Sequence, residues 1–355
     1  MATMVEERPA AVADNNPLGL NGFEFVEFTS PDPAAMEAQF RALGFVPSHR
    51  HPTKNITRWK QGRINLMLNR DADGRVALFR NQHGASASAM AFRVRDPQAA
   101  FEWALAHGGQ RTDEDDHVIL GIGGSYLYFM QDGVDPYASW AEFPGWREEE
   151  AQNSVGLDLL DHLTHNVRRG QMRVWSEFYR TLFGFEEQKY FNIKGQATGL
   201  FSQAMIAPDR AIRIPLNESQ DDKSQIEEFI REYNGEGIQH LALTTPDIYD
   251  TVERLRARGV RLQDTIETYY ELVDKRVPGH GEDLERLRKN RILIDGDVND
   301  DGILLQIFTE PMFGPIFFEI IQRKGNEGFG NGNFQALFES IELDQIRRGV
   351  IKVDA

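Results

Sequence analysis

The feature that most limits how this chain can fold is an internal repeat. Each half shows, twice over, the order of a strand, a helix and several further strands. Residues 91–109 align with residues 242–260 without a gap, and residues 38–45 resemble residues 176–185. Duplication explains this self-similarity better than chance does. We therefore predict an α+β fold of duplicated βαβββ modules.

Hydrophobic periodicity places the elements of this repeat. The first strand of each of the four modules is expected at 23–28, 89–96, 161–167 and 238–245. Each is followed by a helix, and these helices are expected at 32–45, 97–109, 168–185 and 247–260. A further helix is expected near residues 221–234, and another at the C-terminus.

The chain is long enough for two domains, each with its own core. We expect a disordered N-terminal tail over residues 1–20, an N-terminal domain over 21–153 and a C-terminal domain over 154–355. The residues near 136–154 are rich in Pro, Trp and acidic side chains and are expected to form the linker. Residues 323–349 combine a Gly/Asn-rich loop with an amphipathic helix, which is typical of a lid.

Composition excludes several classes of function. The formal net charge is -16, which disfavours binding to nucleic acid or anionic membranes. There is no cysteine, so disulfides, iron-sulfur clusters and thiolate ligands are excluded. No apolar stretch approaches the roughly 18 residues of a membrane span, and the first residues do not resemble a secretion signal. We expect a soluble cytoplasmic protein in which any metal is held by His, Asp, Glu or water.

Three apolar strand-like segments each carry one strong metal-ligating residue. These residues are His162, His240 and Glu319. Two imidazoles and one carboxylate are the set that holds one face of a ferrous ion and leaves the opposite face open. The open face is the physical requirement for a non-haem oxygenase, because substrate and oxygen need positions on the metal. The sequence thus predicts an iron site in the C-terminal half.

The duplication provides an internal control for this site. The counterparts in the first half are Ala89 for His240, a position near Glu24 for His162, and a position near Tyr128 for Glu319. The first half has the same scaffold without the same ligands. Packing of the repeated fold therefore does not by itself require these three residues.

Each candidate also has a purely structural interpretation. A lone histidine in an apolar strand is more often a hydrogen-bonded core residue, and Glu319 could be half of a buried ion pair. A buried carboxylate is costly unless it is paired or bound to metal. The segment 161–167 contains His165 as well as His162, and residues three apart point to opposite faces of a strand. Spacing leaves open which of the two is the ligand.

The second half resembles the 4-hydroxyphenylpyruvate dioxygenase family of the vicinal oxygen chelate superfamily. The resemblance covers most of residues 155–345 and is carried by the segments DHLTHNV, RIPLNES, KSQIEEF, IQHLAL, LLQIFT, FFEIIQR and FGNGNFQALFESIE. It implies two open-barrel domains, of which the N-terminal one is metal-free, and a C-terminal catalytic domain that binds Fe(II). It also implies that His162, rather than His165, joins His240 and Glu319 as an iron ligand.

The same resemblance implies a substrate pocket. The residues matching catalytic polar groups are Ser202, Asn217, Gln225 and Gln239. Those matching substrate-binding and lid positions are Pro215, Gln306, Phe308, Phe317, Phe329, Asn333, Phe334 and Phe338. Within strands, residues two apart share a face, so Gln306 should point with Phe308 and Phe317 with Glu319.

The implied activity is conversion of 4-hydroxyphenylpyruvate and O2 to homogentisate and CO2. It combines oxidative decarboxylation, ring hydroxylation and side-chain migration, and belongs to tyrosine and phenylalanine catabolism. The resemblance also suggests a homodimer or homotetramer. No nucleic acid or membrane partner is expected.

Three alternatives have different consequences. A hydroxymandelate synthase would share fold, substrate and iron ligands but form hydroxymandelate, and Pro215 and Phe338 favour the dioxygenase. An extradiol catechol dioxygenase would need acid/base histidines in its pocket, for which His165 is the obvious candidate. A duplicated binding module that has lost its metal would fail to bind iron.

Overall fold

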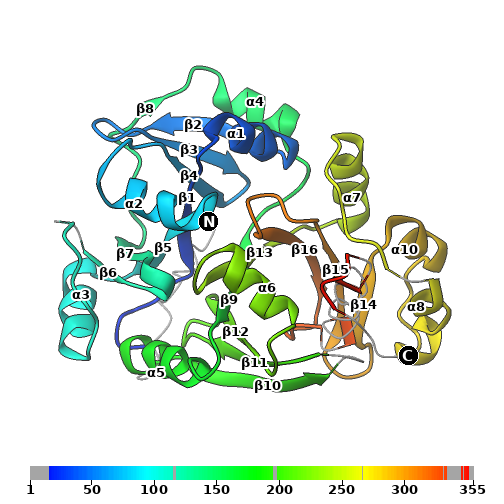
Figure 1. Ribbon diagram of the computed structural model, residues 1–355. Coiled ribbons are helices and arrows are strands. Elements are labelled where there is room, and N and C mark those ends of the chain that lie inside the picture. The colour runs from blue at the N-terminus through cyan, green and yellow to red at the C-terminus, as the bar shows by residue number, and fades with distance from the viewer. Residues whose placement is uncertain are drawn as a thin grey trace, which may run out of the picture.

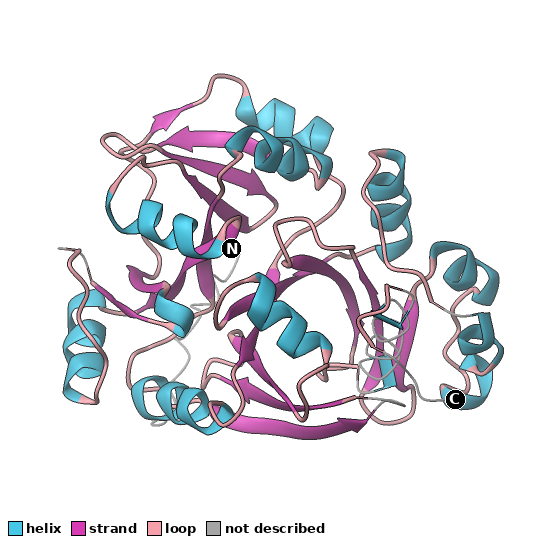
Figure 2. Ribbon diagram, viewed as in Figure 1, coloured by secondary structure: helices cyan, strands magenta, loops and turns pink. Residues whose placement is uncertain are grey.

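Most of the chain folds into two eight-stranded sheets with helices packed around them (Figures 1 and 2). The computed structural model describes residues 16–114, 117–194, 198–265, 267–330, 332–333, 345–346 and 348–351. Within these ranges no helix has both the length and the apolar character needed to cross a membrane.

Both ends of the chain bear on the sequence predictions. The first fifteen residues of the expected tail, and most of the expected C-terminal helix with Phe334 and Phe338, lie outside the described residues. Residues 16–20, which the sequence assigns to the tail, are described. Leu18 and Leu20 are buried there as part of the hydrophobic core. The packed structure therefore begins before residue 21.

The first sheet is built from residues of the N-terminal half. Its strands are β1 (Phe23–Thr29), β2 (Val46–Arg50), β3 (Ile56–Gln61), β4 (Ile64–Asn69), β5 (Ser86–Val94), β6 (Val118–Leu120), β7 (Tyr126–Gln131) and β8 (Ala141–Glu142). Their order is β6-β7-β5-β1-β4-β3-β2-β8. The central pair, β1 and β5, is antiparallel, and it is flanked by parallel neighbours, β4 beside β1 and β7 beside β5.

The second sheet repeats this plan with residues of the C-terminal half. Its strands are β9 (Leu160–Val167), β10 (Glu186–Lys194), β11 (Gly199–Ile206), β12 (Arg213–Ser219), β13 (Gly237–Thr244), β14 (Leu293–Asp297), β15 (Gly302–Phe308) and β16 (Phe317–Lys324). Their order is β10-β11-β12-β9-β13-β16-β15-β14. Again an antiparallel central pair, β9 and β13, is flanked by parallel neighbours, β12 and β16. Each sheet curls into a half-barrel, and the predicted duplication and fold class are confirmed (Figure 1).

Strand register identifies the counterparts of the candidate ligands in the first sheet. In the second sheet Ala242 pairs with His162 on one side and with Glu319 on the other. In the first sheet the equivalent Ala91 pairs with Phe25 and with Tyr128. Tyr128 is thus the counterpart of Glu319, and Phe25, next to Glu24, is the counterpart of His162, so both lie where they were predicted to lie.

The helices surround the two sheets (Figure 2). They are α1 (Pro33–Ala42), α2 (Gly74–His83), α3 (Pro97–Ala106), α4 (Trp146–Asn153), α5 (Met172–Phe183), α6 (Gln225–Glu232), α7 (Ile248–Ala257), α8 (Glu267–Glu271), α9 (Val273–Arg276) and α10 (Leu284–Asn290), with a short 3-10 turn over Ile122–Gly124. The helices α2, α8, α9 and α10 were not predicted, and the segment expected as the linker contains β8 and α4.

In three of the four modules, the helix that follows the first strand begins at a capping aspartate, whereas α5 has no side-chain cap. The side chains of Asp32, Asp96 and Asp247 each accept a hydrogen bond from a backbone N–H in the first turn of α1, α3 and α7. Such a cap satisfies donors that have no partner within the helix. In α1 and α3 a proline follows the cap, where its missing N–H costs nothing.

One continuous apolar core joins the two halves. Phe313, from the loop before β16, packs edge-on against Phe28 and Phe40 at ring-centroid distances of 5.3 Å each. Phe183 at the end of α5 packs against Phe92 of β5 at 5.4 Å. Aromatic pairs at these distances add stabilisation beyond the area they bury. This shared core holds the second sheet, which carries the candidate site, against the first.

Candidate metal centre and substrate pocket

The three predicted ligands lie together on the inner face of the second sheet. His162 comes from β9, His240 from β13 and Glu319 from β16, which are adjacent strands. One ligand atom from each lies within 4.8 Å of the other two. The side-chain exposures are 3–4%. Residues separated by more than 150 positions are thus brought to one buried point.

Distances within the group fit convergence on one ion. Nε2 of His162 lies 3.1 Å from Oε2 of Glu319, and Nε2 of His240 lies 3.4 Å from the same oxygen. The hydroxyl of Thr164 lies 3.0 Å from Nε2 of His240. Two imidazole nitrogens and one carboxylate oxygen therefore face a common centre.

The outward nitrogens of both histidines have acceptors. Oδ2 of Asp161 lies 2.9 Å from Nδ1 of His162, and Oε1 of Gln239 lies 3.0 Å from Nδ1 of His240. An acceptor at Nδ1 holds the proton there and leaves the lone pair of Nε2 directed at the centre. This is the tautomer that a metal ligand requires.

In this group, burial and the neighbouring charges shift the pKa values in opposite directions. Burial penalises the carboxylate of Glu319, but the neighbouring imidazoles outweigh it and hold its pKa at about 2. Burial likewise opposes protonation of His162, but Glu319 and Asp161 outweigh it and raise the pKa of His162. For His240 burial prevails, and its pKa is lowered. Glu319 is consequently ionised and able to bind a cation.

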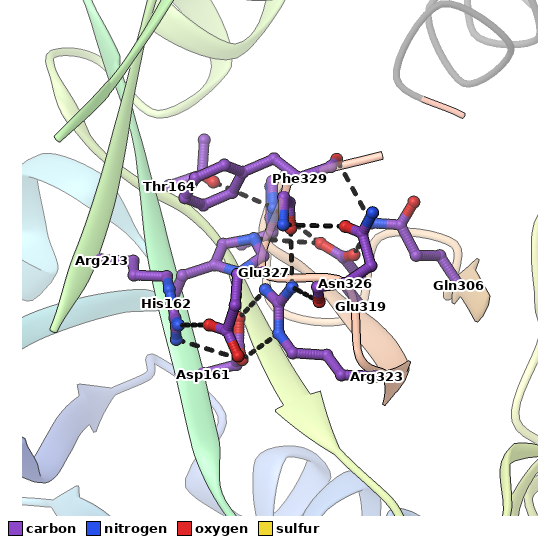
Figure 3. A network of polar contacts seen from close by, with 12 residues as sticks. Asp161, His162, Thr164, Arg213, Gln306, Glu319, Arg323, Asn326, Glu327 and Phe329 are labelled. Carbon is purple, nitrogen blue, oxygen red and sulfur yellow. Dashed lines mark hydrogen bonds and ion pairs between the residues drawn. The ribbon is translucent and has the colours of Figure 1, made fainter. Parts of the chain in front are cut away.

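A network of ion pairs supports the centre from below (Figure 3). Arg323 donates to both oxygens of Asp161, at 2.8 and 2.7 Å. The same guanidinium donates to the backbone carbonyls of Asn326 and Gly328, in the loop that leads to Phe329. Burial opposes ionisation of Asp161, but Arg323 outweighs it and lowers the pKa of Asp161. Asp161 thus joins a candidate ligand, His162, to the loop that closes the pocket.

His165 lies on the opposite face of β9. Its Nε2 is 2.7 Å from the hydroxyl of Tyr179, in the core between the sheet and α5, and the residue is fully buried. Burial lowers the pKa of His165 to about 3, so that it stays neutral. His162, and not His165, is thus the histidine of β9 that lies in the group with His240 and Glu319.

The cavity beside the three ligands contains five of the predicted pocket residues. Its walls are His162, Thr164, Phe191, Ser202, Ala204, Pro215, His240, Gln306, Phe308, Glu319 and Phe329. The predicted members are Ser202, Pro215, Gln306, Phe308 and Phe329. The enclosed volume is about 20 Å³, roughly the space of one water molecule. This space is smaller than a six-membered ring requires.

Two more of the predicted residues, Asn333 and Phe317, lie behind the wall of this cavity. Asn333 donates to Oε1 of Gln306 at 2.9 Å, and Gln306 donates in turn to Glu319. Phe317 stacks on His240, with ring centroids 4.8 Å apart. These contacts hold ligands and wall residues in place.

Three amides have distinct surroundings. Asn217 pairs with Ser202 across the neighbouring strands, is 2% exposed, and its Oδ1 has no partner among the described residues. Gln225 is the first residue of α6 and is buried. Gln239 turns toward Nδ1 of His240 rather than into the cavity.

Sequence reasoning missed several residues of the site. Thr164, Phe191 and Ala204 line the cavity, and Asp161 and Arg323 support it. Thr164 could have been found from its position two residues after His162 on the same strand face. The contact between Asp161 and Arg323 joins positions 162 residues apart and leaves no local signal.

Comparisons with known proteins agree with this geometry. A family model described as "Hydroxyphenylpyruvate dioxygenase, HPPD, N-terminal" matches residues 14–139. A second, described as "Glyoxalase/Bleomycin resistance protein/Dioxygenase superfamily", matches residues 159–272. Two curled sheets of this topology, one carrying a buried His/His/Glu group, define a protein of the vicinal oxygen chelate superfamily.

Relatives that match nearly the whole chain identify the family within this superfamily. The chain is 54% identical to a 4-hydroxyphenylpyruvate dioxygenase of Pseudomonas aeruginosa, over 96% of this chain and 99% of that protein. It is 49% identical to the 4-hydroxyphenylpyruvate dioxygenase of Legionella pneumophila (strain Corby), and this match covers 96% of this chain and 99% of that protein. It is 52% identical to hemolysin VllY of Vibrio vulnificus, over 95% of this chain and 98% of that protein. The chain belongs to the 4-hydroxyphenylpyruvate dioxygenase family.

A solved structure shows the same fold at greater distance. A triple mutant of 4-hydroxymandelate synthase from Streptomyces coelicolor superposes with a TM-score of 0.81 at 26% identity, over 92% of this chain and all of that one. This sequence identity is about half of the identity between this chain and the two dioxygenases described above.

Proposed function

We propose that this protein converts 4-hydroxyphenylpyruvate and O2 to homogentisate and CO2, with Fe(II) held by His162, His240 and Glu319. The observation that carries the proposal is the convergence of three buried ligand atoms within 4.8 Å of one another, in a chain of this family. The proposal places the chain in tyrosine and phenylalanine catabolism.

The donor set fits a ferrous ion. Two neutral imidazoles and one carboxylate are the protein ligands typical of non-haem Fe(II) oxygenases. Both imidazoles have their second nitrogen hydrogen-bonded, and the carboxylate is ionised. Fe(II) bound here would supply open positions for a 2-oxo acid and O2, and would mediate the transfer of electrons from the substrate to O2.

The surrounding side chains orient the ligands. Asp161 and Gln239 keep the proton on the outer nitrogen of each histidine. Gln306 donates to the carboxylate of Glu319 and is itself held by Asn333. Because rotation of any ligand would break one of these bonds, the site is preorganised for a single ion.

Aromatic walls keep water from the reacting centre. Phe308 and Phe329 line the cavity, and Phe317 covers His240 from behind. Burial of this kind protects reactive intermediates from side reactions. The same rings can pack against the aromatic ring of the substrate.

We propose that the substrate hydroxyl lies near the neutral polar groups on β11 and β12. Ser202 lines the cavity, and the carbonyl oxygen of Asn217 lacks a partner although it is buried. A buried acceptor without a partner is costly, and a phenol hydroxyl would satisfy it. Gln225, at the start of the neighbouring α6, is proposed to complete this polar end.

Oxygen uptake with product analysis tests the proposal. With Fe(II) and 4-hydroxyphenylpyruvate, the native protein should consume O2 and release homogentisate. Glu319→Ala should lose bound iron and turnover while keeping its circular dichroism spectrum. Glu310→Ala is the matched control, because this carboxylate is 44% exposed and paired with Arg261 at the surface. Full activity in Glu319→Ala would refute the ligand assignment.

The identity of the product also distinguishes the proposed dioxygenase reaction from the hydroxymandelate synthase reaction. Hydroxymandelate instead of homogentisate would assign the chain to the synthase reaction, despite its higher identity to dioxygenases. Assembly as a homodimer or homotetramer stays a prediction.

A further inference from the structure

The first sheet encloses a cavity that the proposed reaction does not use. It measures about 390 Å³, whereas the cavity at the metal centre measures about 20 Å³. Pockets that bind small molecules are typically about 300–1,000 Å³. Its walls come from the inner face of the first half-barrel and from the segment after β7.

This cavity occupies the place that corresponds to the metal centre. By strand pairing, Phe25 stands where His162 stands in the second sheet, and Tyr128 stands where Glu319 stands. Both Phe25 and Tyr128 line the cavity. Both half-barrels thus have a pocket at this place, and in the first one aromatic rings stand at the positions of two of the three candidate ligands.

The walls are suited to a flat ring. The rings of Phe25 and Tyr128 lie 5.5 Å apart, and those of Tyr137 and Trp140 lie 5.3 Å apart in an edge-to-face arrangement. Met67, on the neighbouring β4, adds a polarisable side chain that adapts to aromatic edges. An aromatic ligand would find stacking and edge contacts on several sides.

The charges at the cavity are already paired within the protein. The carboxylate of Glu27 accepts hydrogen bonds from Arg75, Ser88 and Asn69. Lys54 forms an ion pair with Glu114 at 2.9 Å. A charged ligand would have to break one of these pairs or stay uncompensated, which disfavours it.

One hydroxyl is available for recognition. Burial raises the pKa of Tyr128, so its phenol stays protonated and can donate or accept a hydrogen bond. A ligand with a single hydroxyl group could pair with it without bringing a charge into the cavity.

We propose that this N-terminal cavity is a second small-molecule site, which binds an uncharged aromatic molecule of the phenol class. The site is independent of the metal, because its walls contain none of the three candidate ligands.

Tryptophan emission reports on occupancy. Bromine quenches an indole that it contacts, so titration with 4-bromophenol should remove part of the protein's fluorescence in a saturable way. Trp140→Phe should lose this saturable component. Trp103→Phe is the matched control, because Trp103 lies on α3 at 38% exposure and is not among the cavity walls, and it should keep the component. Absence of saturable quenching in the native protein would overturn the proposal.

The position of the bromine provides a second, independent readout. In crystals soaked with 4-bromophenol, its anomalous signal should lie among Phe25, Tyr128 and Trp140. A signal only beside Phe308 and His240 would show that the phenol binds the metal centre instead, and would contradict the proposal. Phe25→Leu should weaken binding by up to about tenfold, through loss of the ring contact. Unchanged affinity in that variant would also count against the site.

Discussion

Asp161→Asn should weaken both metal binding and stability, because Asp161 has two partners that an amide cannot satisfy together. Its carboxylate accepts from both nitrogens of Arg323 at 2.7–2.8 Å and from Nδ1 of His162 at 2.9 Å. An asparagine that turns its oxygen to Arg323 points its NH2 at His162. The imidazole proton must then move to Nε2, the atom that faces the metal.

The size of both effects follows from burial. Asp161 is 3% exposed and Arg323 14%, so the substitution leaves a buried guanidinium without its counter-charge. Breaking a buried pair in this way costs about 3–5 kcal/mol, and the hydrogen bond that asparagine retains favours the lower end of that range. Loss of the carboxylate behind a ligating histidine typically lowers metal affinity about 10–100-fold.

Two measurements check this prediction. Urea unfolding of the iron-free protein gives the stability change, and a competition titration with a chelator gives the Fe(II) affinity. Asp158→Asn is the matched control: its pair with Arg63 is exposed, with side chains 42% and 67% accessible, and should contribute about 0–1 kcal/mol. If the two variants bind iron equally well and unfold at the same urea concentration, the supporting role of Asp161 is wrong.

Three further predictions concern pH, backbone and metal. His165 has a pKa of about 3 in the folded protein and about 6.5 when unfolded, so only the unfolded state gains a proton as pH falls below 6.5. Lowering the pH from about 6.5 to about 5 should therefore cost about 2 kcal/mol of unfolding free energy, measured by urea titration, and His165→Gln should remove that part of the pH dependence. Gly330→Ala should reduce turnover at least about tenfold, because at φ +66° a Cβ would lie 2.1 Å from Oε1 of Gln306. Gly279→Ala is the control and should keep native turnover, because Gly279 has a similar φ but open space around it. Removal of iron by a chelator should lower the melting temperature, and Fe(II) should restore it, as expected for a ligand that binds only the folded state; an unchanged melting temperature would contradict a site formed by folding.

The repeat and the three residues of the candidate metal centre were predictable because both leave local signals. The alternation of apolar residues defines the strands that carry His162, His240 and Glu319, and the duplicated half shows that the scaffold does not need them. The gapless alignment matched His240 to Ala89 correctly. The looser alignment placed the counterpart of His162 near Glu24, and strand pairing identifies it as the adjacent Phe25.

Other features depend on contacts that one sequence does not reveal. Helix α2 lacks a side-chain cap and mixes polar with apolar residues, so its periodicity is weak. The segment that contains α8, α9 and α10 is strongly charged and interrupted by Pro278, Gly279 and Gly281. The support of His162 by Asp161 and Arg323 depends on tertiary placement alone.

The central claim is that one iron ion is held by the three residues on adjacent strands of the second sheet. The most direct test is a crystal structure of the protein loaded with Fe(II) under anaerobic conditions, with data collected on both sides of the iron absorption edge. The account predicts one anomalous peak per chain, within bonding distance of Nε2 of His162, Nε2 of His240 and a carboxylate oxygen of Glu319. A peak elsewhere, or a fourth protein ligand on the open side, would contradict it.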